Sequence, residues 1–226
     1  MLERNHIFMT RAGTLSIVAT PIGNLGDFSP RAAEVLAAAD IIACEDTRVT
    51  KKLLRLTGTS ISGKIVAYHD YNGEKMRPYL IERINQGDHV ALVSDAGTPL
   101  ISDPGYKLVA ACRGHGLRVT TTPGPSAAIA ALTISGLPSD RFLFAGFVPT
   151  AQKAREKQFA ELASLSATSI WFDTPSRLAR SLSDMASVFG NRQACVAREI
   201  TKLHEEALHG SLGGLAADLQ AKPPMK

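Results

Sequence analysis

The 226-residue sequence contains only three cysteines, Cys44, Cys112 and Cys195, and they lie far apart in the chain. None of them belongs to a Cys-x-x-Cys pair or to a cluster of cysteine and histidine. This pattern excludes a disulfide framework and a zinc site. We expect three reduced thiols in the core of a cytoplasmic protein.

The sequence also lacks long apolar runs. No stretch is long enough to span a membrane, and the N-terminal segment MLERNHIFMTRAG has no apolar core of the kind found in signal peptides. We therefore expect a soluble, unsecreted protein without a membrane partner. The net charge is only +4, from 25 basic and 21 acidic residues, which permits a polyanionic partner without requiring one.

Several nucleotide-binding motifs are missing. Neither the dinucleotide fingerprint GxGxxG nor the GxGxG common after the first strand of Rossmann-type methyltransferases occurs. Residues 58–64, GTSISGK, match most of a P-loop, but Ile65 replaces the hydroxyl residue that binds magnesium. Lys64 is moreover expected to open a strand, whereas a P-loop lysine opens a helix. The sequence therefore argues against all three sites.

Strands and helices alternate through the first half of the chain. This predicts an open, mainly parallel five-stranded sheet with helices on both faces. A second alternation predicts a smaller mixed sheet with helices. We expect a flexible arm (1–13), an N-terminal α/β domain (14–122) and a C-terminal α/β domain (123–226). The expected strands are 15–20, 40–44, 64–68, 91–93 and 117–120, then 142–145, 169–172 and 194–197.

Three helix starts carry capping signals. Ser29 followed by Pro30 predicts one, and Thr47 is expected to cap the next. In that second helix we expect an inward face and a largely outward basic face. The inward residues are Val49, Leu53, Leu54 and Leu56, and the basic ones are Arg48, Lys51, Lys52 and Arg55. Before Tyr106, either Ser102 or Asp103 is expected to cap, with Pro104 in the first turn.

The sequence is organised around residues 91–105, ALVSDAGTPLISDPG. A buried strand here runs into small residues, which leave room for a ligand at the carboxyl end of a parallel strand. The other expected strand ends are PIGNLGD, CEDTR, YHDYN and TTPGPSAA. They are rich in small, polar or charged residues, so we expect the site at this edge of the sheet.

Some of these residues have two interpretations. Ser126 lies outside any GxSxG motif, so a helix cap facing a ligand is preferred over a nucleophile. Asp95 and Asp103 suit either a metal or a turn and cap. His69 is either packed or catalytic, and the basic run Lys51, Lys52 and Arg55 either faces solvent or contacts phosphates.

Taken together, the motifs resemble the ribosomal RNA small subunit methyltransferase I family, a branch of the tetrapyrrole methylases. The motifs are TPIGNLGD, CEDTRVTKKLL, YHDYN, ALVSDAGTPLISDPGY, TPGPSAA, SGLPSDRF and AREITKLHEE, in this order. The resemblance implies methyl transfer from S-adenosylmethionine to the ribose 2'-hydroxyl of a cytidine in the decoding region of 16S rRNA. It also implies two α/β domains with the cofactor between them, a homodimer and no metal.

The resemblance also implies the site residues. The cofactor-binding residues would be Pro21, Ala96, Gly97, Thr98, Ile101, Ser126, Ala127, Phe172 and Glu199. Thr98 stands where the class usually has an aspartate, so a hydroxyl would replace a carboxylate. The adenine side would involve Phe172-Asp173 and Arg198-Glu199.

This chain departs from the family pattern in three places. Residues 171–178 read WFDTPSRL where the family has FYESPHRL, and residues 69–74 read HDYNGE where it has HxHNE. The family also continues past the position of Lys226 into a further strand and a small helical region. We therefore expect a truncated C-terminal domain.

The implied reaction needs a proton acceptor and a cation, because a ribose hydroxyl is a weak acid. We expect Asp46 or Glu199 to accept the proton and Arg48 or Lys202 to supply the cation. The expected RNA phosphate contacts are Arg48, Lys51, Lys52, Lys153, Arg155 and Arg177. Two alternatives stay open: a methyltransferase acting on a tetrapyrrole or another small molecule, and a noncatalytic RNA-binding assembly module.

Overall fold

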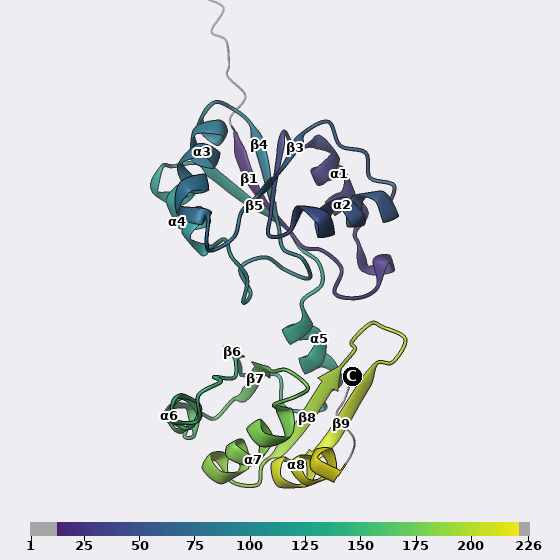
Figure 1. The fold of residues 1–226 in the computed structure, drawn as a ribbon, viewed down its shortest axis with the longest axis vertical. Coiled ribbons are helices and arrows are strands. Elements are labelled where there is room, and N and C mark those ends of the chain that lie inside the picture. Colours follow the sequence, from purple (N-terminus) through teal and green to yellow (C-terminus); the bar gives the residue numbers. More distant parts are fainter. Residues whose placement is uncertain (1–12, 222–226) are drawn as a thin grey trace, which may run out of the picture. The chain divides into compact units, whose positions relative to one another are not determined.

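The computed structural model describes residues 13–221, and these divide into two compact units. The first unit ends at Ser126 and the second begins at Ala127 (Figure 1). The flexible arm expected over residues 1–13 lies, apart from Gly13, outside the described residues.

A five-stranded parallel sheet forms the centre of the first unit, as predicted. Its strands are β1 (Thr14–Val18), β2 (Ile41–Cys44), β3 (Lys64–Ala67), β4 (His89–Val93) and β5 (Arg118–Thr122). They lie in the order β3-β2-β4-β1-β5, and every pairing is parallel. All five carboxyl ends therefore meet at one edge of the sheet. Lys64 opens β3, which agrees with the argument against a P-loop.

Helices cover both faces of this sheet because the side chains of each strand point alternately to opposite faces. The helices are α1 (Pro30–Ala38), α2 (Thr47–Leu56), α3 (Gly73–Asn85) and α4 (Tyr106–Gly114), with a 3-10 turn η1 (Leu25–Asp27) after β1. On one face α3 and α4 pack against residues such as Ile41 and Leu92. On the other, α1 and α2 pack against residues such as Ile42 and Val93 (Figure 1).

The predicted cap of α1 is confirmed, but those of α2 and α4 are wrong. The Ser29 hydroxyl accepts the Ala32 N–H at 3.1 Å. In α2, Asp46 is the cap, because its carboxylate accepts the N–H of Arg48 at 2.8 Å. In α4 the cap is Gly105. Its φ of 135° is a backbone conformation that glycine adopts easily and other residues rarely adopt.

The inward face predicted for α2 is also partly wrong. Leu54 is buried, but the side chains of Val49 and Leu56 are exposed, and Thr50 is buried instead. A residue four positions before Leu54 shares its helix face, whereas Val49 does not. The buried stripe of α2 is therefore narrower than its apolar residues suggest.

The second unit contains both parallel and antiparallel pairs, distributed over two small sheets. The strands β6 (Phe142–Phe147) and β7 (Thr168–Phe172) pair in parallel, and β8 (Gln193–Arg198) and β9 (Glu206–Ser211) pair antiparallel. The helices are α5 (Ala127–Ile134), α6 (Gln152–Leu162), α7 (Leu178–Phe189) and α8 (Leu212–Ala221). Sequence reasoning missed β9, because its segment EALHGS has no run of β-branched residues.

The core of the second unit lies between α6, α7, α8 and the strands. Phe159 is its largest fully buried side chain, and the rings of Trp171 and Phe189 lie 5.1 and 5.4 Å from it. Arg155 is buried in the same unit and forms an ion pair with Asp184. It also donates to the carbonyl oxygens of residues 149 and 150, both at 3.1 Å. The predicted phosphate contact by Arg155 is therefore wrong.

Cys44 and Cys112 are buried, Cys195 is half-buried, and all three are free thiols. Burial raises the pKa of each thiol. Within residues 13–221, no helix combines the length and apolar character needed to cross a membrane.

Candidate functional site

The loops that follow β1 and β4 are joined by backbone hydrogen bonds at the carboxyl edge of the sheet. Thr20 donates its N–H to the carbonyl oxygen of Gly97 at 2.9 Å, and Gly97 donates its N–H to the carbonyl oxygen of Thr20 at 3.1 Å. The Thr20 hydroxyl also donates to the carbonyl oxygen of Ser94 at 3.2 Å. The β4 loop is thereby held against the end of β1.

A third segment, the one that follows β5, joins these two loops. The hydroxyl of Thr98 donates to the carbonyl oxygen of Pro125 at 2.8 Å. A Cβ atom placed on Gly124 would lie 2.8 Å from the Cβ of Ala19, so only glycine allows this approach. We call residues 20–22, 94–98 and 123–126 the three-loop cluster. It is built entirely within the first unit.

Gly97 lies at the centre of the three-loop cluster and needs to be glycine. Its φ is 85°, and an added Cβ would lie 3.2 Å from Cγ2 of Ile22. The neighbouring Ala96 is exposed and has only a methyl group. Ligands bind at the carboxyl ends of strands in other parallel sheets, and the small side chains at this edge suit such a site.

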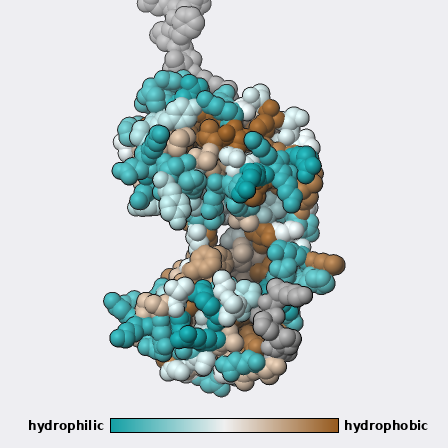
Figure 2. All heavy atoms as spheres, in the orientation of Figure 1, coloured by the Kyte–Doolittle hydropathy of each residue, from teal (hydrophilic) through white to brown (hydrophobic). Residues whose placement is uncertain are grey.

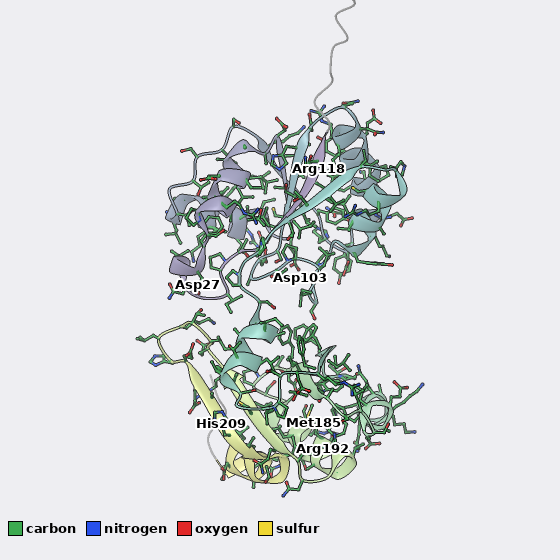
Figure 3. The ribbon with its side chains drawn as sticks, turned by 180° about the vertical axis from the view of Figure 1, so that it is seen from behind. Asp27, Asp103, Arg118, Met185, Arg192 and His209 are labelled. Atoms are coloured by element: carbon green, nitrogen blue, oxygen red, sulfur yellow. The ribbon has the colours of Figure 1, made fainter. Side chains whose placement is uncertain are left out.

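The structure thus brings together most of the first-unit residues expected to bind the cofactor. Pro21 and Ser126 are half-buried in the three-loop cluster, and the side chain of Ile101 is 40% exposed a short turn after Thr98. Figure 3 shows the edge they occupy: Asp27 and Asp103 lie at the end of the first unit where these loops gather, and Arg118 lies at the other end.

Beside the three-loop cluster, the segment after β2 carries an ion pair. The carboxylate of Asp46 lies 2.6 Å from the guanidinium of Arg48, whose side chain is 88% exposed. The hydrogen bonds from the Arg48 side chain and N–H lower the pKa of Asp46 to about 2. The Asp46 N–H in turn donates to the carboxylate of Asp95 at 3.1 Å. Asp46 is therefore fully ionised at neutral pH.

Glu45 lies near a group of carboxylates, of which sequence reasoning singled out Asp95 and Asp103 but not their grouping with Glu45 and Asp70. Burial raises its pKa, and the negative charges of Asp95, Asp103 and Asp70 raise it further. Burial also raises the pKa of Asp103. In the sequence, Asp70, Glu45 and Asp95 follow the ends of three expected strands. The strand order β3-β2-β4 makes these strands neighbours and so brings the three residues together. Within residues 13–221, no group of three such side chains is placed to hold a metal ion.

The remaining expected site residues belong to the second unit. Ala127 opens α5, and the ring of Phe172 packs edge-on against Phe144 and Phe147. Glu199 and Lys202 lie in the loop from β8 to β9 and form an ion pair of 3.0 Å. Glu199 has a φ of 51°, an uncommon conformation for a residue with a side chain.

The basic residues expected to contact phosphates divide into two groups. Lys51, Lys52 and Arg55 are exposed on α2, and Lys153 is exposed on α6. Arg177 is instead ion-paired with Asp173 at 2.6 Å. Figure 2 shows hydrophilic residues over much of the visible face of the first unit, interrupted by hydrophobic patches.

Comparisons with known proteins agree with this fold. Residues 14–216 match the family model of the Tetrapyrrole (Corrin/Porphyrin) Methylases. The chain is 53% identical to a Ribosomal RNA small subunit methyltransferase I of Mesorhizobium japonicum, over 89% of this chain and 68% of that protein. It is 50% identical to the protein of the same name from Xylella fastidiosa, over 92% of this chain and 76% of the relative.

A solved structure shares the fold at low sequence identity. It is the uroporphyrin-III C-methyl transferase of Thermus thermophilus complexed with S-adenyl homocysteine. The TM-score is 0.61 at 18% identity, with 94% of each chain covered. By its family model and its close relatives, this chain belongs to the tetrapyrrole methylases and, within them, to the ribosomal RNA small subunit methyltransferase I family.

Proposed function

We propose that the chain is an S-adenosylmethionine-dependent methyltransferase that modifies RNA of the small ribosomal subunit. The specific target we propose is the ribose 2'-hydroxyl of a cytidine in the decoding region of 16S rRNA. The observation that carries the proposal is the three-loop cluster, found in a chain about half identical to methyltransferases of small-subunit rRNA. From the resemblance to this family, we also propose that the protein is a cytoplasmic homodimer.

The residues of the three-loop cluster fit a methyl donor. The exposed Ala96 and the half-buried Pro21 and Ser126 would present short side chains to a ligand, and the buried Gly97 holds the loop against Thr20. S-adenosylmethionine, when bound, supplies a methyl group already activated by its sulfonium sulfur. The protein therefore has to hold the donor and align the acceptor oxygen, which is where most of its rate enhancement would arise.

Two ion pairs are the candidates for handling the proton. Asp46 pairs with Arg48 in the first unit, and Glu199 pairs with Lys202 in the second. A carboxylate with a pKa of about 2 is ionised at neutral pH but weakly basic, so Asp46 would orient the hydroxyl more than it would take its proton. The paired cations would stabilise the negative charge that develops on the oxygen.

RNA phosphates would bind the exposed basic face of α2. Lys51, Lys52 and Arg55 extend from this face, and the exposed Arg48 lies in its first turn. Because the first turn of α2 lies at the same edge as the three-loop cluster, phosphate contacts here would bring the nucleotide to the donor. Lys153 is the remaining exposed cation of the set we predicted.

The proposal is tested by titrating S-adenosylmethionine into the protein calorimetrically and then assaying transfer of labelled methyl into small ribosomal subunits. We expect binding, incorporation into 16S rRNA and a label on a cytidine ribose. Donor binding with no incorporation into subunits would instead favour a small-molecule methyltransferase. RNA binding without donor binding would favour a noncatalytic assembly module.

A further inference from the structure

Two tyrosines of the first unit are almost uncovered by the chain. The side chain of Tyr71 is 99% exposed and that of Tyr106 is 73% exposed. Tyrosine is usually at least half-buried, because its ring gains free energy when it leaves water. Neither exposed ring stabilises the folded chain appreciably, so their presence needs another explanation.

Both tyrosines lie at the edge that carries the three-loop cluster. Tyr71 lies between β3 and α3, two residues before the helix begins, and Tyr106 is the first residue of α4, after the β4 loop. The strands β3 and β4 lie on either side of β2, whose end carries Asp46 and Arg48. The helices α3 and α4 also pack against each other on one face of the sheet (Figure 1). The two rings therefore lie on the segments that follow the two strands beside β2.

The backbone that presents Tyr71 is held firmly. The side chain of Asn72 accepts the His69 N–H at 2.9 Å and donates to the Ala67 carbonyl oxygen at 2.9 Å. Gly73 donates its N–H to the His69 carbonyl oxygen at 2.8 Å. The His69 ring meets the Tyr71 ring edge-on, with centroids 6.1 Å apart. A ligand stacking on Tyr71 would order little of the loop.

Tyr106 is presented by a similarly constrained turn. Gly105 has a φ of 135°, and a Cβ there would lie 2.8 Å from Cδ2 of Leu92 in the core. The carbonyl oxygen of Gly105 accepts the N–H of Leu108 at 3.0 Å, which fixes the first turn of α4. The backbone that carries the Tyr106 ring is therefore anchored to the sheet.

The charges around these rings indicate which part of a nucleic acid they would meet. Tyr71 follows Asp70, and Asp70, Asp95 and Asp103 are close enough to Glu45 to raise its pKa. Such carboxylates repel phosphates but leave the neutral face of a base free to stack. Aromatic rings are the usual partners of unpaired RNA bases, whatever their sequence.

We propose that Tyr71 and Tyr106 form a stacking site for unpaired RNA bases next to the nucleotide that is methylated. This inference rests on the proposed function, since it takes small-subunit rRNA as the substrate. The basic face of α2 binds the phosphates, and the two rings hold bases at the acidic part of the edge. The site thereby favours a single-stranded or locally unpaired segment over a duplex.

The test compares Tyr71→Ala and Tyr106→Ala with the phenylalanine variants at the same positions. We expect each alanine variant to raise KM for small subunits, and Kd for a single-stranded RNA oligonucleotide, roughly tenfold. The phenylalanine variants should stay near the wild type because they keep the ring. Leu56→Ala is the control. Leu56 is also exposed, at 51%, but it is the last residue of α2 and lies away from the carboxyl edge of the sheet.

Several outcomes would overturn the stacking site while leaving the proposed function intact. One is a wild-type KM and RNA Kd in both alanine variants. Another is a loss of S-adenosylmethionine binding that matches the loss of RNA binding. A third is a lower sedimentation coefficient of the alanine variants, which would make the tyrosines an interface between two copies. A wild-type enzyme that transfers no methyl to subunits would contradict the proposed function, and the oligonucleotide Kd would still decide the stacking site.

Discussion

The hydroxyl of Thr98 donates a hydrogen bond of 2.8 Å to the carbonyl oxygen of Pro125. This bond connects the loop after β4 with the segment after β5, two of the three parts of the cluster proposed to hold the methyl donor. The resemblance to the family implied that this hydroxyl replaces a carboxylate toward the cofactor. In the structure its hydrogen has a partner within the protein, so we assign Thr98 a positioning role.

Replacing Thr98 with valine should weaken donor binding by roughly fivefold. Valine keeps the shape but removes the hydrogen bond, which at this half-buried position is worth about 1 kcal/mol. Thr98→Ser should restore binding because it keeps the donor. Calorimetric titration of S-adenosylmethionine measures both, and equal affinity in the valine and serine variants would show that the bond does not matter.

Replacing Gly97 with alanine should weaken donor binding more than it lowers the free energy of unfolding. The φ of 85° costs about 1–2 kcal/mol with a Cβ present, and that atom would also crowd Ile22. Urea unfolding gives the stability, and titration gives the donor affinity. Gly58→Ala is the control, since its φ is 66° but an added Cβ meets nothing within 4 Å. Comparable losses of donor affinity in both variants would contradict a local role for Gly97.

Reversing two charges on α2 should separate RNA binding from donor binding. In Lys51→Glu plus Lys52→Glu, we expect weaker binding to small subunits, a shallower salt dependence and unchanged affinity for S-adenosylmethionine. The control, Arg113→Glu plus Arg118→Glu, makes the same charge change at exposed positions by the opposite edge of the sheet. Equal loss of RNA binding in both double variants would indicate a general effect of net charge.

Removing the partner of Arg155 should destabilise the second unit. In Asp184→Asn the buried guanidinium loses its counter-charge, which costs about 3 kcal/mol in comparable pairs. Asp218→Asn, at an exposed position on α8, should change the free energy of unfolding very little. If Asp184→Asn were as stable as the wild type and bound RNA more tightly, Arg155 would have the phosphate role that we rejected.

The pKa of Asp46 depends on Arg48, and this gives a prediction about pH. The pKa is lowered from its ordinary value of 3.8 to about 2, so the ionised pair favours folding above pH 3.8 and is lost as the pH falls through 2. In Arg48→Ala the pKa should return toward 3.8. An NMR titration of the Asp46 carboxyl carbon measures it, and an unchanged midpoint would show that Arg48 is not the cause.

The sheet was predictable from the sequence because its strands are short apolar runs that end in turn residues. Boundaries and caps were less predictable. Thr47 and Asp46 are equally good caps in isolation, and the structure distinguishes them because the Asp46 carboxylate accepts the Arg48 N–H while the Asp46 N–H donates to Asp95. The strand β9 was missed because it is defined by its pairing with β8, not by its composition.

The site was predictable only in part. The residue types of its loops can be recognised in the sequence, but the hydrogen bonds between the loops cannot. Glycine and proline mark residues 94–105 as a special turn in any reading of the sequence. That Thr98 bonds Pro125, 27 residues later, depends on the placement of β1 between β4 and β5. The burial of Arg155 could likewise not be predicted from the sequence, because its partner Asp184 lies on a different helix.

The central claim is that the three-loop cluster of the first unit holds the methyl donor. A crystal structure of the protein with S-adenosylhomocysteine tests it most directly. We predict that the bound molecule contacts Ala96 and Gly97 together with the segment of residues 123–126. Density for the molecule at another place in the fold, with this cluster filled only by solvent, would contradict the account.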